Sequence, residues 1–198
     1  MKKWLSILII LITAGGCFWD NSDADTPFFT GDPAFTITRI LAEGKNITAL
    51  EVTDDHNFCY SAGNKLYLFN EGAETSVELV SDVTSIARNA KDKSIWVGTV
   101  SSGLSCVKNG NIQYYNQENC QLPRNLVRDV LCDPEGRVWF NCSAFKLGGL
   151  GLLADNKTEI FTPSNSSLPD NLIKSTAFRN GKIYVATGGT VTQQEVVL

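Results

Sequence analysis

The sequence has very little histidine and methionine: one of each among 198 residues, His56 and Met1. A single His argues against a metal site built from several imidazoles, and it leaves His56 alone to complete a serine or cysteine triad. The turn-like setting of His56, Asp54-Asp55-His56-Asn57, indicates a solvated loop residue instead. One Met excludes a Met-rich adaptable groove. These absences argue against common catalytic and promiscuous-binding sites.

Positive charge and cysteine are also scarce. Lys and Arg total 17 against 21 Asp and Glu, a net charge of −4, whereas nucleic-acid binding usually needs a basic face. Six cysteines are too few for a small scaffold held by disulfides. A hydrophobic content of 43% and an aromatic content of 10% predict a globular chain with a packed core.

The N-terminus has the pattern of an export signal. Lys2 and Lys3 precede an uncharged stretch, Trp4 to Ala14, which is shorter than the roughly 20 residues that span a bilayer. The following Gly15-Gly16-Cys17 resembles a bacterial lipobox, which implies cleavage after residue 16 and acylation of Cys17. An ordinary secretory peptide with a chance Cys, or an uncut anchor, are the alternatives.

Residues 17–34 are predicted to be an acidic tether. They show no periodicity and carry four aspartates among small residues and prolines: Asp20, Asp23, Asp25 and Asp32. Acidic residues directly after a lipid-bearing Cys resemble the surface-export signals of Bacteroidetes lipoproteins. The predicted location is therefore the bacterial cell envelope, with the lipid as the membrane contact, at the outer membrane on its periplasmic or its outer side.

Five cysteines remain beyond Cys17, an odd number that leaves at least one thiol free. Cys106 and Cys120 would close a hairpin-sized loop and form the best disulfide candidate. Cys132 and Cys142 flank a turn but do not lie opposite each other. Free, buried cysteines acting as small apolar residues are the alternative for Cys59 and the others.

The body of the chain, residues 35–198, repeats a pattern of short alternating strands and tight turns. The repeats lie near residues 46–80, 82–115, 126–162 and 172–198. Each has an aromatic residue on its second strand, and the spacings of 36, 43 and 45 residues separate Tyr60, Trp96, Trp139 and Tyr184. About four strands per 40–50 residues predict an all-β fold, a β-propeller of four blade-like, four-stranded antiparallel repeats. The four aromatics are expected in the core between blades.

The third repeat identifies a family resemblance. Asp133-Pro134-Glu135-Gly136-Arg137-Val138-Trp139-Phe140, then Gly148-Gly149-Leu150, resembles the two-component regulator propeller repeat. The second repeat supplies Ile95-Trp96-Val97-Gly98-Thr99 and Ser102-Gly103-Leu104, and the linker Asn165 to Ile173 is similar to the connector between blades of that family. The resemblance implies an extracytoplasmic sensor propeller of the Bacteroidetes type, often one that senses polysaccharide breakdown products. No kinase, receiver or DNA-binding region follows in this sequence.

Two arrangements remain open for the blades. Residues 35–41 could supply the strand that the fourth repeat lacks and close a small ring. Alternatively, the repeats form part of a larger propeller, whose open ends would associate with a second copy.

The predicted function is a non-enzymatic binding or sensing module, with no cofactor and no metal. Its predicted partners are a carbohydrate-derived ligand or a signalling protein, and not nucleic acid. Polar residues near strand starts could line a channel mouth: Asn125, Arg128, Asn171 and Lys174. The alternatives are a carbohydrate-processing propeller or a lyase, since Val138-Trp139-Phe140 also resembles the repeat of streptogramin B lyase, and a structural interaction module or truncated sensor fragment.

Overall fold

A computed structural model describes residues 42, 44–54, 57–144, 147–188 and 195–196. The chain divides into two units, Met1–Ile47 and Thr48–Leu198, and apart from Ile47 the strands belong to the second. Within the described ranges no helix is long and apolar enough to cross a membrane. The predicted signal peptide, Cys17, the tether and the candidate closing strand at 35–41 all lie outside the described residues.

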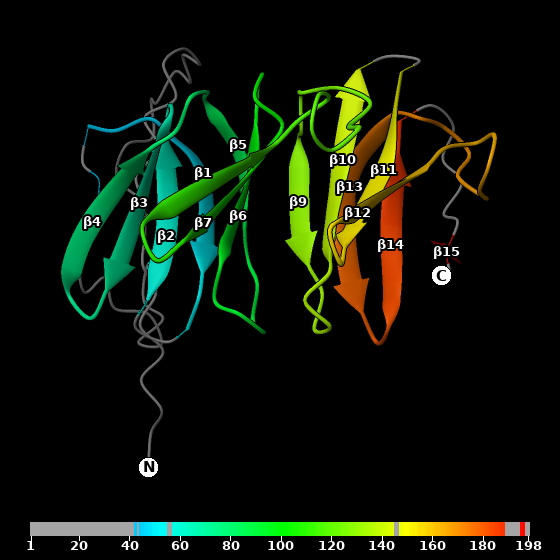
Figure 1. Ribbon diagram of the computed structural model, residues 1–198. Helices are drawn as coiled ribbons and strands as arrows, with labels where there is room; N and C mark the ends of the chain where they lie inside the picture. The colour runs from blue at the N-terminus through cyan, green and yellow to red at the C-terminus, as the bar shows by residue number, and fades with distance from the viewer. Residues whose placement is uncertain (1–41, 43, 55–56, 145–146, 189–194, 197–198) are drawn as a thin grey trace, which may run out of the picture. The chain divides into compact units, whose positions relative to one another are not determined.

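The described part of the chain forms four antiparallel sheets in chain order (Figure 1). The first contains β1 (Ile47–Val52), β2 (Phe58–Ala62), β3 (Lys65–Asn70) and β4 (Ala73–Glu78). The second contains β5 (Val83–Arg88), β6 (Ile95–Thr99), β7 (Leu104–Lys108) and β8 (Asn111–Tyr115). The third contains β9 (Asp129–Cys132), β10 (Val138–Ala144), β11 (Leu147–Ala154) and β12 (Lys157–Phe161). The fourth contains β13 (Ile173–Arg179), β14 (Lys182–Thr187) and β15 (Glu195–Val196).

Three of the described connections between neighbouring strands are tight turns. Asn109-Gly110, Asp155-Asn156 and Asn180-Gly181 have positive φ at both positions, between 48° and 78°. Two consecutive positive φ angles define the tight hairpin loop whose twist matches that of the flanking strands. Asn, Asp and Gly tolerate this conformation best, which is why the turns were readable in the sequence.

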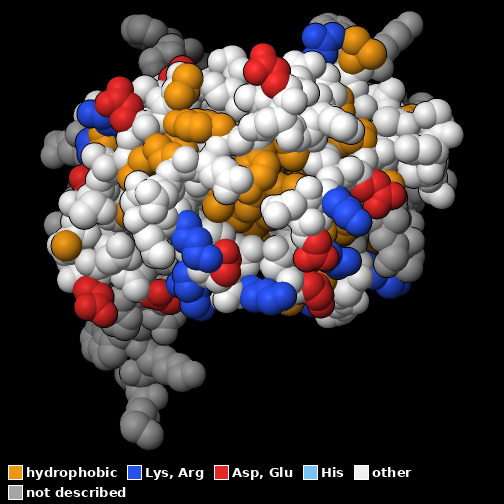
Figure 2. Space-filling view, viewed as in Figure 1, with side chains coloured by type: hydrophobic (Ala, Val, Ile, Leu, Met, Phe, Trp, Pro, Cys, Tyr) orange, Lys and Arg blue, Asp and Glu red, His pale blue; other side chains and the backbone are white. Residues whose placement is uncertain are grey.

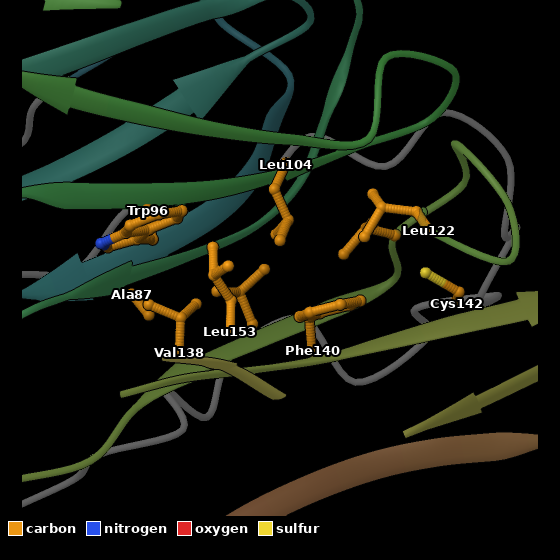
Figure 3. Close-up of a cluster of buried hydrophobic side chains, with 10 residues drawn as sticks. Ala87, Trp96, Leu104, Leu122, Val138, Phe140, Cys142 and Leu153 are labelled. Carbon is orange, nitrogen blue, oxygen red and sulfur yellow. The ribbon is translucent and has the colours of Figure 1, made fainter. Parts of the chain in front are cut away.

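Successive sheets pack face to face, and a hydrophobic cluster fills each of the three junctions. The first junction is centred on Cys59, Leu66, Ile86 and Val97. The second contains Trp96, Leu104, Val138, Phe140 and Leu153, with Leu122 reaching in from the β8–β9 connector (Figure 3). The third contains Trp139, Leu150, Phe161, Ile173 and Val185. The first strands of successive sheets, β5, β9 and β13, are also neighbours in space, and we call the first strand of each sheet its inner strand. The sheets therefore have the arrangement of propeller blades.

Trp96 and Trp139 are held by turn residues that precede them. Trp139 Nε1 donates to Asp133 Oδ2 at 2.9 Å, and Asp133 also accepts from the backbone N and Nε of Arg137 at 2.9 and 2.6 Å. In the second sheet Trp96 Nε1 donates to Ser94 Oγ at 3.1 Å, and Ser94 Oγ donates to Asp92 Oδ1 at 2.6 Å. Asp92 and Asp133 both accept hydrogen bonds from groups within their own turns. Each caps its turn and orients the indole that follows.

The core prediction for the aromatic anchors is confirmed for Trp96 and Trp139, which are buried between sheets. Tyr60 is buried on the side of the first sheet that faces away from the second, and Tyr184 is 43% exposed. Tyr184 pairs with the exposed Ala177 on the side of the fourth sheet opposite Ile183 and Val185, which pack against the third sheet. The prediction for Tyr184 was wrong because the described chain places no further sheet over that side.

The first sheet differs from the sequence interpretation in one detail. Cys59 packs toward the second sheet, while Tyr60 points the other way and stacks on Tyr67 with ring centroids 4.8 Å apart. The fourth sheet has three strands among the described residues, in keeping with the sequence pattern of the fourth repeat, which lacks one strand.

Candidate functional site

Polar side chains of the inner strands connect neighbouring sheets. Asp129 on β9 accepts from Ser85 Oγ on β5 at 3.4 Å, and from the backbone N and Oγ1 of Thr176 on β13, both at 2.8 Å. Ser85 Oγ also accepts from the backbone N of Val130 at 3.0 Å. These four hydrogen bonds join three inner strands. Both carboxylate oxygens of Asp129 accept hydrogen bonds from neighbouring blades, so Asp129 holds these blades together.

A second polar link joins the first and second sheets. The backbone N of Arg88 donates to Glu51 Oε1 at 3.3 Å, and Arg88 Nη1 donates to the carbonyl of Thr53 at 2.7 Å. Burial raises the pKa of Glu51, against the lowering influence of Arg88. This carboxylate also serves packing between sheets.

Asn141 on β10 was not singled out in the sequence. It stands where the second repeat has Gly98 and is fully buried, opposite Asp129 in the strand pairing. Its side-chain nitrogen and oxygen have no hydrogen-bond partner among the described residues. Gly98 lies so close to the next repeat that a Cβ there would be 3.0 Å from the carbonyl oxygen of Val127. The sequence does carry a sign of this buried amide, because the third repeat has Asn at the position where the second repeat has Gly.

The four predicted channel-mouth residues lie at the starts of β9 and β13. Arg128 and Lys174 are exposed, and Asn125 and Asn171 are half-buried. Asn125 Oδ1 accepts from the backbone N of Gln117 at 2.9 Å, and its carbonyl accepts from Gly103 at 2.8 Å. Asn125 therefore shapes the β8–β9 connector. The prediction that these residues bind a ligand remains a prediction.

A cleft of about 360 Å³ lies at the turns of the second and third sheets. We call it the turn cleft; it is lined by Asn89, Lys91, Asp92, Glu135, Gly136, Arg137, Ala154 and Asp155. Asn89 Nδ2 donates to the carbonyl of Gly136 at 2.9 Å, and Lys91 Nζ donates to that of Glu135 at 3.3 Å. Charges of both signs meet here, and in Figure 2 basic and acidic side chains are likewise interspersed over the face shown. The lining therefore favours neither anions nor cations.

A larger cleft, of about 540 Å³, lies between the edge strands β8 and β12. We call it the amide cleft; its lining residues are Gln113, Tyr115, Asn119, Cys120, Gln121, Asn156, Lys157 and Thr158. Cys120 Sγ and Thr158 Oγ1 lie 2.8 Å apart and join the β8–β9 connector to β12. Four of the eight residues carry neutral amides and none carries a carboxylate, so this cleft has a uniform chemical character.

The described residues provide little for catalysis. Among them no group of three or more His, Cys, Asp or Glu side chains could hold a metal ion. His56 lies outside the described residues. Burial by itself would raise the pKa of Asp92, but Lys108 at 2.8 Å and hydrogen bonds from Ser94 lower it to about 2. Asp92 is therefore ionised at neutral pH and cannot serve as a general acid there.

The cysteines of the propeller are free thiols in this structure: Cys59, Cys106, Cys120, Cys132 and Cys142. The candidate disulfide between Cys106 and Cys120 is not formed. Cys132 pairs with Val138 and Cys142 with Gly149, which confirms that these two do not lie opposite each other. Burial raises the pKa of Cys59, Cys132 and Cys142 to about 12.

The thiols should differ sharply in reactivity. With a pKa of about 12, only about one Cys59 or Cys142 side chain in ten thousand is a thiolate at pH 8. We expect iodoacetamide to label half-buried Cys120 first and to label Cys59 and Cys142 only after unfolding in urea. Peptide mass spectrometry of native and denatured samples measures this order. Equal labelling of Cys59 and Cys120 in the native protein would contradict it.

No protein-family model and no curated protein sequence matches the chain. Solved structures do match. The extracellular domain of the hybrid two-component system BT4673 from B. thetaiotaomicron is similar with a TM-score of 0.59 and 16% identity, over 79% of this chain and 23% of that one. The corresponding domain of BT3049 from the same organism gives 0.58 and 15%, over 71% and 22%. The computationally designed protein Ika4 gives 0.57 and 12%, over 80% of this chain and 96% of its own.

The chain thus spans less than a quarter of the two sensor domains, yet nearly the whole of the designed protein. At these identities the similarity establishes the fold. Together with the sheet order and the three packed junctions, it confirms the fold predicted from the sequence and supports the resemblance to two-component regulator propellers. The four sheets are blades of a β-propeller.

Proposed function

We propose that the chain is a lipid-anchored, extracytoplasmic propeller module that binds or senses a carbohydrate-derived ligand or a signalling partner without turning it over. The observation that supports this most is the likeness of its sheets to extracellular domains of bacterial sensor systems. Cys17 is the acylated residue in this proposal, and it anchors the chain in the cell envelope.

The chemistry of the described residues is consistent with binding in preference to catalysis. The inner-strand carboxylates Glu51 and Asp129 are committed to contacts between blades. Asp92 and Asp133 are committed to their turns. The chain spans less than a quarter of the sensor domains, so the binding role in this proposal is assigned to the four described sheets.

A thermal-shift screen of the full chain against neutral, acidic and sulfated oligosaccharides tests the proposal. A ligand at ten times its Kd contributes about 1.4 kcal/mol to the folded state. For a domain of this size that should raise Tm by about 3–6 °C. Stabilisation with the saccharide recovered intact supports the proposal. Shortened or unsaturated products would overturn it in favour of a propeller enzyme.

A further inference from the structure

The amide cleft has the volume of a small-molecule site. Its volume of about 540 Å³ lies within the range typical of ligand pockets. It lies between two blades, with β8 and the β8–β9 connector on one side and β12 on the other. The contact between Cys120 and Thr158 holds these two sides together.

The amides of the cleft differ in their availability. Asn119 Oδ1 accepts from the backbone N of Asn116 at 2.8 Å, and its Nδ2 donates to the carbonyl of Tyr114 at 2.9 Å, so Asn119 fixes the connector. Gln113, Gln121 and Asn156 are exposed, and the hydrogen bonds found among the described residues do not involve their side chains. Three amides are therefore free to donate to and accept from a ligand.

The backbone presents two of these amides in an uncommon conformation. Gln121 has φ of 53° and Asn156 has φ of 60°. Asn tolerates the left-handed region, but a longer side chain such as Gln rarely occupies it without strain. Strained conformations of this kind cluster at ligand sites. Gln121 lies next to Cys120, whose thiol contacts Thr158 of β12.

An aromatic side chain completes the lining. Tyr115 is half-buried, and its ring packs on Trp96 with centroids 5.2 Å apart at 37°. This contact holds the tyrosine in place at the cleft. The remaining polar groups are the Thr158 hydroxyl and one cation, Lys157, with no carboxylate. The lining therefore lacks the acids that a cation needs, the basic cluster that an anion needs and the apolar pocket that would anchor a peptide side chain.

We propose that the amide cleft binds a neutral oligosaccharide. Amide side chains can pair with neighbouring sugar hydroxyls, donating to one and accepting from the other. The rigid Tyr115 ring offers an apolar surface for the C–H face of a pyranose. Gln113, Gln121 and Asn156 make the polar contacts in this proposal. It rests on the proposed function, since it assigns the ligand class and the site to the binding module.

Calorimetric titration of the full chain with neutral trisaccharides of glucose, galactose, mannose and xylose tests this site. The variant carries Gln121→Gly and Asn156→Gly, because glycine adopts positive φ without strain while both amide-bearing side chains are removed. The matched control is Asn180→Gly, which makes the same change at a positive-φ turn of the fourth sheet. We expect Kd to rise at least tenfold in the variant and to stay unchanged in the control.

The outcomes separate this site from the proposed function. Wild-type binding that the double variant keeps would overturn the site and leave the binding function standing. Binding confined to acidic or sulfated saccharides would overturn the neutral ligand class alone. If none of the four trisaccharides binds, the site is also overturned. Turnover of a saccharide would overturn the proposed function. Both variants should unfold at the same urea concentration as the wild type. This result would show that a loss of binding comes from the missing side chains and not from unfolding.

Discussion

Replacing Trp139 with Ala should lower the free energy of unfolding by about 3–5 kcal/mol, the cost typical of removing a buried Trp or Phe side chain. Trp139 is 1% exposed and packs against Phe161 with ring centroids 6.1 Å apart. The substitution opens a cavity in the junction between the third and fourth sheets. It also removes one of the donors to the buried carboxylate of Asp133. Urea denaturation followed by circular dichroism measures the change.

Tyr184→Ala is the matched control for Trp139→Ala. Tyr184 stands at the corresponding point of the fourth repeat but is 43% exposed. We expect this change to cost less than about 1 kcal/mol, as surface substitutions usually do. Equal losses for the two variants would mean that the outer side of the fourth sheet is also a packed junction, contrary to this structure.

Gly151→Ala should be a damaging single-carbon addition in the third sheet. A Cβ at Gly151 would lie 2.1 Å from Cζ of Phe140, its partner across the strand pair. Phe140 is fully buried in the junction with the second sheet, so its ring has no free space to move into. Overpacking of this kind typically costs about 1–3 kcal/mol. The midpoint of urea unfolding should fall accordingly.

A second substitution tests whether the clash causes that loss. Phe140→Leu shortens the side chain that meets the new methyl group, and by itself it should destabilise the core modestly. Combined with Gly151→Ala, it should cost less than the two single losses added together, because each change relieves the other. Strict additivity in this double-mutant cycle would show that Gly151 is needed for another reason.

The repeat could be predicted because each of its signals is local. Turn dipeptides such as Asn109-Gly110 set the hairpins, and strand alternation set the buried faces. Asp133 and Trp139 lie in one short segment, so a single sequence motif contains both partners of their hydrogen bond. Tyr184 marks the limit of this reasoning. The pattern shows that a residue occupies an inter-blade position, but it does not show whether a neighbouring blade covers it.

The candidate site could not be predicted because it is assembled from segments distant in the chain. Gln113 and Gln121 belong to the second repeat and its connector, whereas Asn156 belongs to a hairpin of the third. In the sequence, Asp155-Asn156 indicates a turn and nothing more. The four residues predicted at a channel mouth were chosen by position along the repeat, and they lie elsewhere, at the starts of β9 and β13. These amides come together because the second and third sheets pack face to face, which places β8 next to β12.

We propose that this propeller binds a saccharide and leaves it chemically unchanged. Native mass spectrometry of the full chain with its best-stabilising trisaccharide is the sharpest test of that proposal. We expect one adduct per chain with the mass of the intact trisaccharide, unchanged after prolonged incubation. Adducts or free species with the masses of cleaved or eliminated sugars would contradict it, and so would absence of any adduct at saturating trisaccharide.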